Sequence, residues 1–108
     1  MNENDSTPKS ERIVIHGDPE MKELIENFLK NRCQDILQIH QAVETKDFET
    51  VRTLGHSMKG SGSGYGFDQV TIIGAHLEEY AKIRNAEDIH KSVDELQSYL
   101  DRVEVLYE

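Results

Sequence analysis

The chain of 108 residues contains no tryptophan, two prolines and a single cysteine, Cys33. One cysteine excludes an intrachain disulfide, and a lone free thiol fits a reducing compartment. No apolar run approaches the ~20 residues that a membrane-spanning helix needs. The amino terminus also has neither the basic start nor the apolar core of a signal peptide. We therefore expect a cytoplasmic protein with no membrane partner.

Positive charge is scarce: 12 lysines and arginines stand against 21 aspartates and glutamates, which gives a formal net charge of −9. Nucleic acids and anionic membranes attract positively charged surfaces, so we expect no nucleic-acid partner. The length corresponds to one ordinary domain. The chain is too short to hold a catalytic domain together with a regulatory one.

Apolar residues recur at three- and four-residue steps along most of the chain, as is typical of amphipathic helices. The pattern predicts four helices at about 19–45, 47–64, 68–84 and 86–107. Asp18 followed by Pro19, Asp47 and Asn85 can cap three of them. Short connections make successive helices antiparallel neighbours. We therefore predict an all-α fold, an antiparallel up-down four-helix bundle.

The amino-terminal residues differ from the rest of the chain. Residues 1–11 are polar and predict a disordered tail, so the domain is expected to span 12–108. The short apolar run 13–15 predicts an extended segment that lies against the bundle, either as a packing flap or as part of a partner interface.

Glycines are concentrated in and beside the second predicted helix, at Gly55, Gly60, Gly62 and Gly64. A glycine inside a helix costs roughly 1 kcal/mol relative to alanine. Four glycines would therefore destabilise a helix that had a purely structural role. We infer that another molecule approaches this backbone closely.

His56 lies on the exposed side of that helix. At ~100° per residue, the apolar residues fall within ~60° of Val51, whereas His56 falls near 140°. The exposed strip contains Arg52, His56, Lys59, Gly60 and Ser63. Because no carboxylate lies between Arg52 and Gly66, the strip is expected to be locally cationic.

This layout favours a histidine that accepts a phosphoryl group. Such a histidine needs an exposed ring nitrogen, a nearby cation and room for a bulky donor. Lys59 supplies an ammonium group one turn from His56, and Gly60 leaves the ring unshielded.

Glu78 is predicted to lie level with His56. The second and third helices turn near residue 67, and the two residues lie eleven positions on either side of it. Each is therefore ~16 Å from the turn at ~1.5 Å per residue. A carboxylate that accepts the Nδ1 proton would leave Nε2 free as a nucleophile. Alternatively, Glu78 is a solvated acid or a partner of Lys82.

These residues resemble a known family. The run 56–61 (His-Ser-Met-Lys-Gly-Ser), followed by Gly66 and Phe67 and then by Leu77 and Glu78, is similar to the histidine-containing phosphotransfer (HPt) domain. That family has His-x-hydrophobic-Lys-Gly-Ser, a glycine ten residues after the histidine, and a later Leu-Glu. The resemblance covers nearly the whole domain, from about Asp18 to Tyr107.

The resemblance implies a four-helix bundle in which His56 Nε2 accepts a phosphoryl group from a receiver-domain aspartate and passes it to another receiver. It also implies that Lys59 steadies the phosphoryl group and that Glu78 hydrogen-bonds the histidine. The partner surface is expected to include Arg52, Gly60 and Ser63. The receiver would supply the aspartate and Mg²⁺, so no cofactor or metal site is expected here. The protein would be a monomeric relay intermediate, not an enzyme.

The Gly-Tyr-Gly-Phe run at 64–67 also resembles the phosphoacceptor domain of chemotaxis histidine kinases, which an ATP-binding kinase domain phosphorylates. Expected partners are therefore receiver domains and a hybrid or chemotaxis-type histidine kinase. The chain stops at Glu108 without a kinase segment, which favours a stand-alone module, but a piece cut from a longer protein would look the same. Gly62 and Gly64 depart from the commonest pattern and predict that the second helix frays or turns early.

Two rival interpretations come from other classes. A di-iron bundle enzyme uses paired Glu-x-x-His motifs, but Glu87 and His90 form the only one in the chain. A bundle without phosphoryl chemistry leaves the glycines unexplained. His40 is predicted to be partly buried, and Cys33 to be a core or boundary residue.

Overall fold

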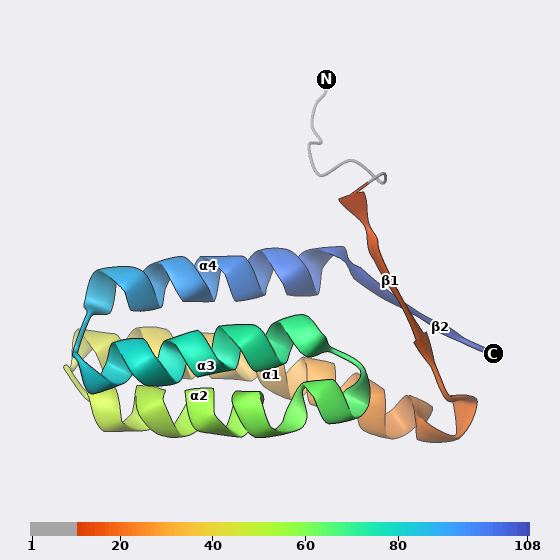
Figure 1. The fold of residues 1–108 in the computed structure, drawn as a ribbon, viewed down its shortest axis with the longest axis horizontal. Helices are drawn as coiled ribbons and strands as arrows, with labels where there is room; N and C mark the ends of the chain where they lie inside the picture. Colours follow the sequence, from red (N-terminus) through yellow and green to blue (C-terminus); the bar gives the residue numbers. More distant parts are fainter. Residues whose placement is uncertain (1–10) are drawn as a thin grey trace.

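A computed structural model describes residues 11–108 of the chain, so most of the predicted tail at 1–11 lies outside the described residues. Figure 1 shows the order of the elements along the chain. They are β1 (Ile13–Gly17), a 3₁₀ turn (Pro19–Met21), α1 (Lys22–Glu44), α2 (Phe48–Ser61), a 3₁₀ turn (Ser63–Tyr65), α3 (Asp68–Lys82), α4 (Ala86–Arg102) and β2 (Val103–Tyr107).

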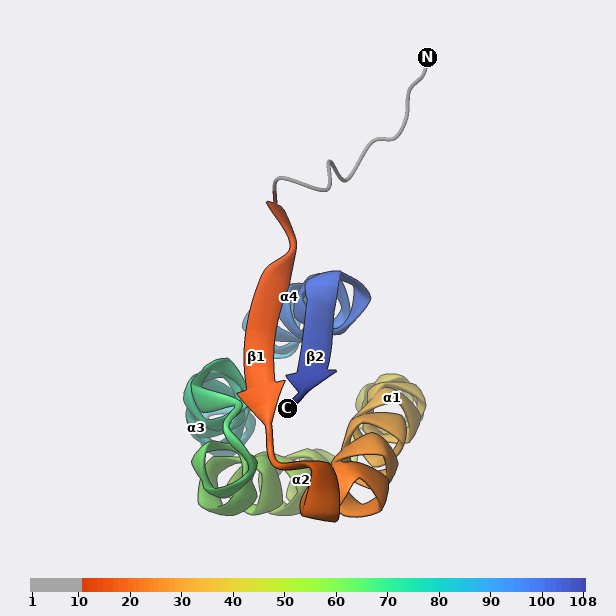
Figure 2. The ribbon, with the colours of Figure 1, turned by 90° about the vertical axis from the view of Figure 1, so that its right-hand side faces the viewer.

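The four helices form an antiparallel bundle, which confirms the predicted fold. The end-on view in Figure 2 shows α1 and α3 on opposite sides, between α2 and α4. The most deeply buried side chains lie between the helices: Ile39, Val51, Met58, Phe67, Val70, Ile73, Leu77, Ile89, Val93 and Leu96. No helix within residues 11–108 is long and apolar enough to cross a membrane.

Side chains cap the helices where the sequence predicts. Asp18 Oδ1 accepts a hydrogen bond of 2.8 Å from the Glu20 amide, just before α1. Asp47 accepts one of 3.2 Å from the Thr50 amide, and Asn85 accepts one of 3.1 Å from the Asp88 amide. Each bond satisfies an amide that has no partner inside its helix.

The prediction that the fourth helix continues to residue 107 is wrong. The helix α4 ends at Arg102, and β2 pairs in parallel with β1, from Ile13 opposite Val103 to Gly17 opposite Tyr107. Residues of β2 alternate between half-buried and exposed, as the two-residue period of a strand requires. The predicted extended run at 13–15 is therefore one strand of a two-stranded sheet that closes one end of the bundle (Figures 1 and 2).

The second helix ends at Ser61, three residues before the predicted limit. Gly66 has a φ of 95°, a left-handed conformation that glycine adopts without strain. Next to it, Phe67 is fully buried and stacks on Phe28 with 5.5 Å between ring centroids. Tyr65 stacks on the same Phe28 ring at 4.7 Å. These contacts anchor the turn between α2 and α3 onto α1.

Two side chains of α1 are more exposed than predicted. His40 is exposed and stacks against His90 of α4, with 5.6 Å between ring centroids. Cys33 is also exposed. In contrast, Asp35 is buried, and its Oδ2 accepts a hydrogen bond of 2.8 Å from Arg32 Nε.

Candidate functional site

His56 stands on the outer face of α2, with 67% of its side chain exposed. Val51 and Met58 of the same helix are fully buried on the opposite face. Helical periodicity therefore orients the ring away from the core, as the sequence predicts.

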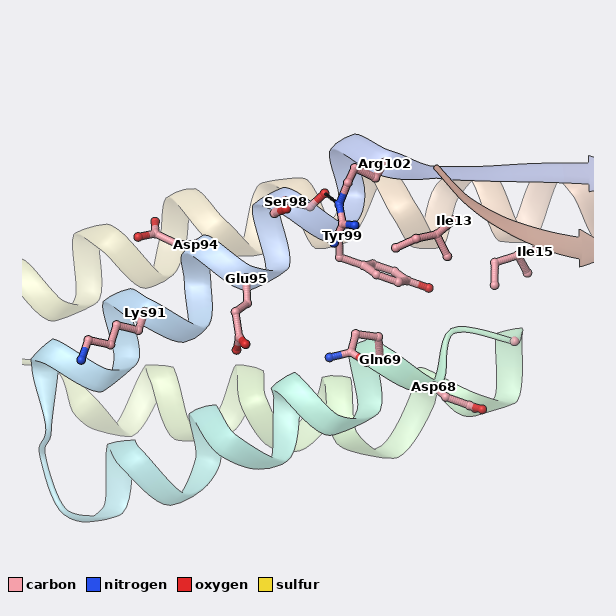
Figure 3. Close-up of a pocket in the computed structure, with 11 residues that line it drawn as sticks. Ile13, Ile15, Asp68, Gln69, Lys91, Asp94, Glu95, Ser98, Tyr99 and Arg102 are labelled. Carbon is pink, nitrogen blue, oxygen red and sulfur yellow. Dashed lines mark hydrogen bonds between the residues drawn. The ribbon is translucent and has the colours of Figure 1, made fainter. Parts of the chain in front are cut away.

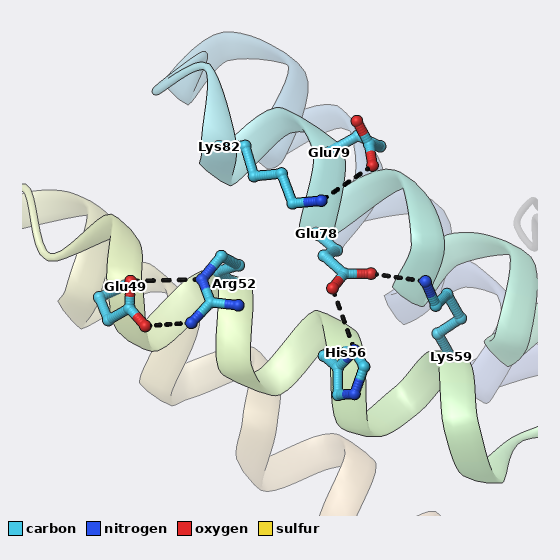
Figure 4. A network of polar contacts seen from close by, with 7 residues as sticks. All are labelled: Glu49, Arg52, His56, Lys59, Glu78, Glu79 and Lys82. Carbon is cyan, nitrogen blue, oxygen red and sulfur yellow. Dashed lines mark hydrogen bonds and ion pairs between the residues drawn. The ribbon is translucent and has the colours of Figure 1, made fainter.

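The Nδ1 atom of His56 lies 3.0 Å from Glu78 Oε2 on α3 (Figure 4). Only 7% of the Glu78 side chain is exposed. Because an ionised carboxylate only accepts hydrogen bonds, Nδ1 must carry the proton in this contact. The lone pair of the neutral ring is then on Nε2, which gives that nitrogen its nucleophilic character.

Glu78 also contacts a cationic group, because Lys59 Nζ lies 2.8 Å from its other oxygen, Oε1. The carboxylate thus bridges the ammonium and the imidazole (Figure 4). The hydrogen bond from Lys59, reinforced by the one from His56, lowers the pKa of Glu78 below its ordinary value, although burial opposes this. The same contact raises the pKa of Lys59. Glu78 is therefore ionised at neutral pH despite its burial.

The alternative pairing of Glu78 with Lys82 does not occur. Lys82 Nζ instead lies 3.4 Å from Glu79 Oε2. The first of the two sequence alternatives, in which Glu78 contacts His56, is the one that the structure contains.

The exposed strip is less cationic than predicted. Arg52 forms an ion pair with Glu49 one turn earlier on α2, with Nε 3.3 Å from Oε1. The charge of Lys59 is balanced by its ion pair with Glu78 from the neighbouring helix. Both carboxylates lie outside the segment between Arg52 and Gly66, so the charge count along that segment missed them.

The four glycines in and beside α2 fall into two groups. An added Cβ would meet no heavy atom within 4 Å at Gly60 or at Gly64. At Gly62, by contrast, it would lie 2.6 Å from the Thr71 amide nitrogen, and Gly55 is similarly enclosed by α3. The inference that another molecule approaches this backbone therefore applies to Gly60 and Gly64, whereas packing inside the domain explains Gly55 and Gly62.

Ser63 lies beyond the end of α2, in the 3₁₀ turn Ser63–Tyr65. Its amide donates a hydrogen bond of 2.8 Å to Thr71 Oγ1, and its own hydroxyl lies 3.1 Å from the same oxygen. These bonds tie the turn to α3. The helical phase that placed Ser63 beside His56 required a helix as far as residue 64.

A cavity lies elsewhere, between α3, α4 and β1 (Figure 3). Its volume is about 770 Å³, and its lining includes Ile13, Gln69, Glu95 and Tyr99 but none of the residues around His56. No group of three or more histidine, cysteine or acidic residues that could hold a metal ion occurs in the part of the chain that the structure describes. His56 thus lies on an open surface, which suits a macromolecular partner better than a small ligand.

The Hpt domain family matches residues 23–105, a span that includes His56, Lys59 and Glu78. This chain belongs to the Hpt domain family. Members are intermediates in phosphorelays that interact with receiver domains and histidine kinases, and they are not catalysts in their own right.

A curated relative of this Hpt chain is multistep phosphorelay regulator 1 of Schizosaccharomyces pombe (strain 972 / ATCC 24843). It is 24% identical over 70 residues, which cover 65% of this chain and 24% of the relative. The match thus spans about a quarter of the relative's length. No solved structure matches the chain.

Proposed function

We propose that His56 carries the phosphoryl group of a phosphorelay, accepting it on Nε2 from the aspartate of one receiver domain and passing it to another. The geometry that supports this proposal is the contact of Nδ1 with Glu78, 3.0 Å away, on a side chain that is 67% exposed. One nitrogen is held by the protein, and the ring stays accessible to a partner.

In the proposed step, the Nε2 lone pair attacks the phosphorus of an aspartyl phosphate. The new P–N bond forms as the P–O bond to the aspartate breaks, and the aspartate leaves as a carboxylate. The ring keeps its Nδ1 proton and gains positive charge, which the Glu78 carboxylate offsets. Transfer to the next receiver reverses these changes on a second aspartate.

Lys59 is proposed to steady the phosphoryl group. An ammonium has three donors, so it can keep its ion pair with Glu78, at 2.8 Å, and donate a hydrogen bond to a phosphoryl oxygen. Glu78 would orient His56 through the bond to Nδ1. The contacts of Glu78 with His56 and Lys59 and the family motif support these two roles.

The partner surface is proposed to centre on His56 and to include Gly60 and Arg52. Gly60 supports this assignment because its Cβ position is open to solvent. Ser63 was also predicted to join this surface, and it lies exposed in the turn after α2 with its hydrogen bonds directed to Thr71. The receiver would bring the aspartate and Mg²⁺ needed for the reaction, so we propose no cofactor for this chain. We also propose a cytoplasmic monomer.

A chemotaxis-type histidine kinase is the second candidate donor, because the Gly-Tyr-Gly-Phe run at 64–67 resembles the phosphoacceptor domain of such kinases. The relative from Schizosaccharomyces pombe is a multistep phosphorelay regulator, which favours the receiver-to-receiver role.

The test is phosphoryl transfer to the purified wild-type chain and to His56→Gln, from a receiver domain charged with acetyl phosphate. His76→Gln is the matched control, since it removes another exposed histidine, on α3. We expect an acid-labile gain of one phosphoryl group on the wild type and on the control but not on His56→Gln. If an ATP-charged chemotaxis-type kinase alone supports this gain, the second candidate replaces the first. The same gain on His56→Gln would refute the assignment of His56.

A further inference from the structure

The helices α2 and α3 approach each other closely at a pair of glycines. A Cβ added to Gly74 would lie 2.6 Å from both the Lys59 amide nitrogen and Met58 Cβ, and 2.7 Å from the Gly55 carbonyl oxygen. A Cβ added to Gly55 would lie 2.7 Å from the Glu78 amide nitrogen and 2.8 Å from the Gly74 carbonyl oxygen. Each glycine therefore makes room for the backbone of the other helix.

This crossing lies at the level of the functional side chains. Gly55 immediately precedes His56 and touches the backbone of Glu78, while Gly74 touches the backbone of Lys59. The pair therefore sets the distance between the two helix backbones at the point where Glu78 reaches across to α2.

The contacts of Glu78 with α2 tolerate only a small increase in the distance between α2 and α3. Its contacts with His56 and Lys59 are 3.0 and 2.8 Å, and two side chains about 3.6 Å apart no longer form a hydrogen bond. Ordinary contact of a Cβ begins at 3.4 Å, so an alanine at Gly74 must move the helices apart by several tenths of an ångström. Lys59 has a long flexible stem and can follow this movement. His56 has only two side-chain torsions, so its bond to Glu78 is the sensitive one.

We propose that Gly55 and Gly74 are positioning residues, which hold α2 and α3 close enough for Glu78 to fix the Nδ1–H tautomer of His56. The consequence for phosphotransfer rests on the proposed function. The consequence for the tautomer does not, because it concerns the resting protein.

The test measures the ¹⁵N chemical shifts of the His56 ring, which distinguish a protonated from an unprotonated nitrogen. Spectra are recorded at pH 8.5, about two units above the ordinary imidazole pKa of about 6.5. We expect a single Nδ1–H tautomer in the wild type and a mixture of both tautomers in Gly74→Ala and Gly55→Ala. The initial rate of phosphoryl transfer should fall about tenfold in both variants, since loss of an orienting partner typically has effects of that size.

Gly62→Ala is the matched control. It creates a contact of 2.6 Å with the Thr71 amide, between the same two helices but at the turn instead of beside His56. It should lower the free energy of unfolding while keeping the His56 tautomer. If the fraction of His56 in the Nδ1–H tautomer falls no further in Gly74→Ala than in Gly62→Ala, the glycines have only a packing role and the proposal is wrong.

Glu78→Asp tests the same argument without new clashes, in case the alanine variants do not fold. It withdraws the carboxylate by about one C–C bond, ~1.5 Å, and should also give mixed tautomers. A single Nδ1–H tautomer in Glu78→Asp would show that the helix separation does not control the contact. On a Glu78→Gln background, Gly74→Ala should slow transfer no further, because the glycine acts through Glu78.

The two readouts separate the two proposals. One outcome is that His56 has mixed tautomers in the two glycine variants, while no protein, wild type included, accepts a phosphoryl group. This outcome would support the positioning role and refute the proposed function. A wild type that transfers normally, with Gly74→Ala unchanged in both tautomer and rate, would do the reverse.

Discussion

Gly60 offers a test in which stability and function move in opposite directions. It lies inside α2, and the Cβ of an alanine there would meet no heavy atom within 4 Å. Replacing a helical glycine with alanine stabilises by about 0.5–1 kcal/mol. For a domain of this size, Gly60→Ala should therefore raise the melting temperature by about 3–6 °C. Urea unfolding followed by circular dichroism measures the gain in the free energy of unfolding, and thermal unfolding measures the change in melting temperature.

The same position should tolerate no bulk when a partner docks. Gly60 lies one helical turn from His56, so a side chain there projects beside the ring. Gly60→Gln keeps most of the helix propensity of alanine but adds a long side chain. We expect Gly60→Gln to be at least as stable as the wild type and to accept a phosphoryl group from a charged receiver at least tenfold more slowly.

The control for bulk alone is Ser98→Gln, an exposed change on α4 and away from His56. It should leave the transfer rate unchanged. If Gly60→Gln accepts the phosphoryl group as fast as Ser98→Gln, close approach of a partner is not the reason for glycine at this position. A loss of stability in Gly60→Ala would show that an unidentified contact inside the domain requires the glycine.

Two further predictions concern Glu78 and β2. The pKa of Glu78 is held below its ordinary value of 4.5, and that of Lys59 above its ordinary 10.5. The extra stability of the wild type over Glu78→Gln should therefore be present between about pH 4.5 and 10.5, and it should fade as the pH falls or rises beyond that window. Urea unfolding at each pH measures the difference in the free energy of unfolding. A difference that does not change with pH would contradict this prediction. Val105→Ala removes half-buried apolar surface between β2 and the core, so it should lower the free energy of unfolding by about 1 kcal/mol, whereas Leu106→Ala on the exposed face should have a smaller effect.

The helices were predictable because their signals are local. A capping side chain and an apolar stripe act within a few residues, so α1, α2, α3 and most of α4 could be located from the sequence. The end of α4 could not be located in this way. Val103 and Leu106 continue the three-residue spacing of the helix, while residues 103, 105 and 107 also alternate as a strand does. Pairing with β1, some 90 residues away in the chain, decides between the two.

The site shows the same division between local and distant causes. The position of Glu78 beside His56 was predictable as one of two alternatives, because the hairpin geometry brings them level. The two groups of glycines could also have been separated by phase: Gly55 lies four residues after Val51 and Gly62 four after Met58, on the buried face. Gly60 lies four residues after His56, on the exposed face. Treating all of them as one motif concealed that difference.

The charge balance around His56 has a consequence for a carrier that must also release its phosphoryl group. Charge-assisted hydrogen bonds to phosphate are strong, and a site with free cations would hold the group tightly. Here Lys59 is already bound to Glu78, and Arg52 to Glu49. An arriving phosphoryl group must share Lys59 with a buried carboxylate. Under the proposed function, this sharing limits how strongly the protein stabilises phosphohistidine, so the next receiver can take the group with its own aspartate and metal ion.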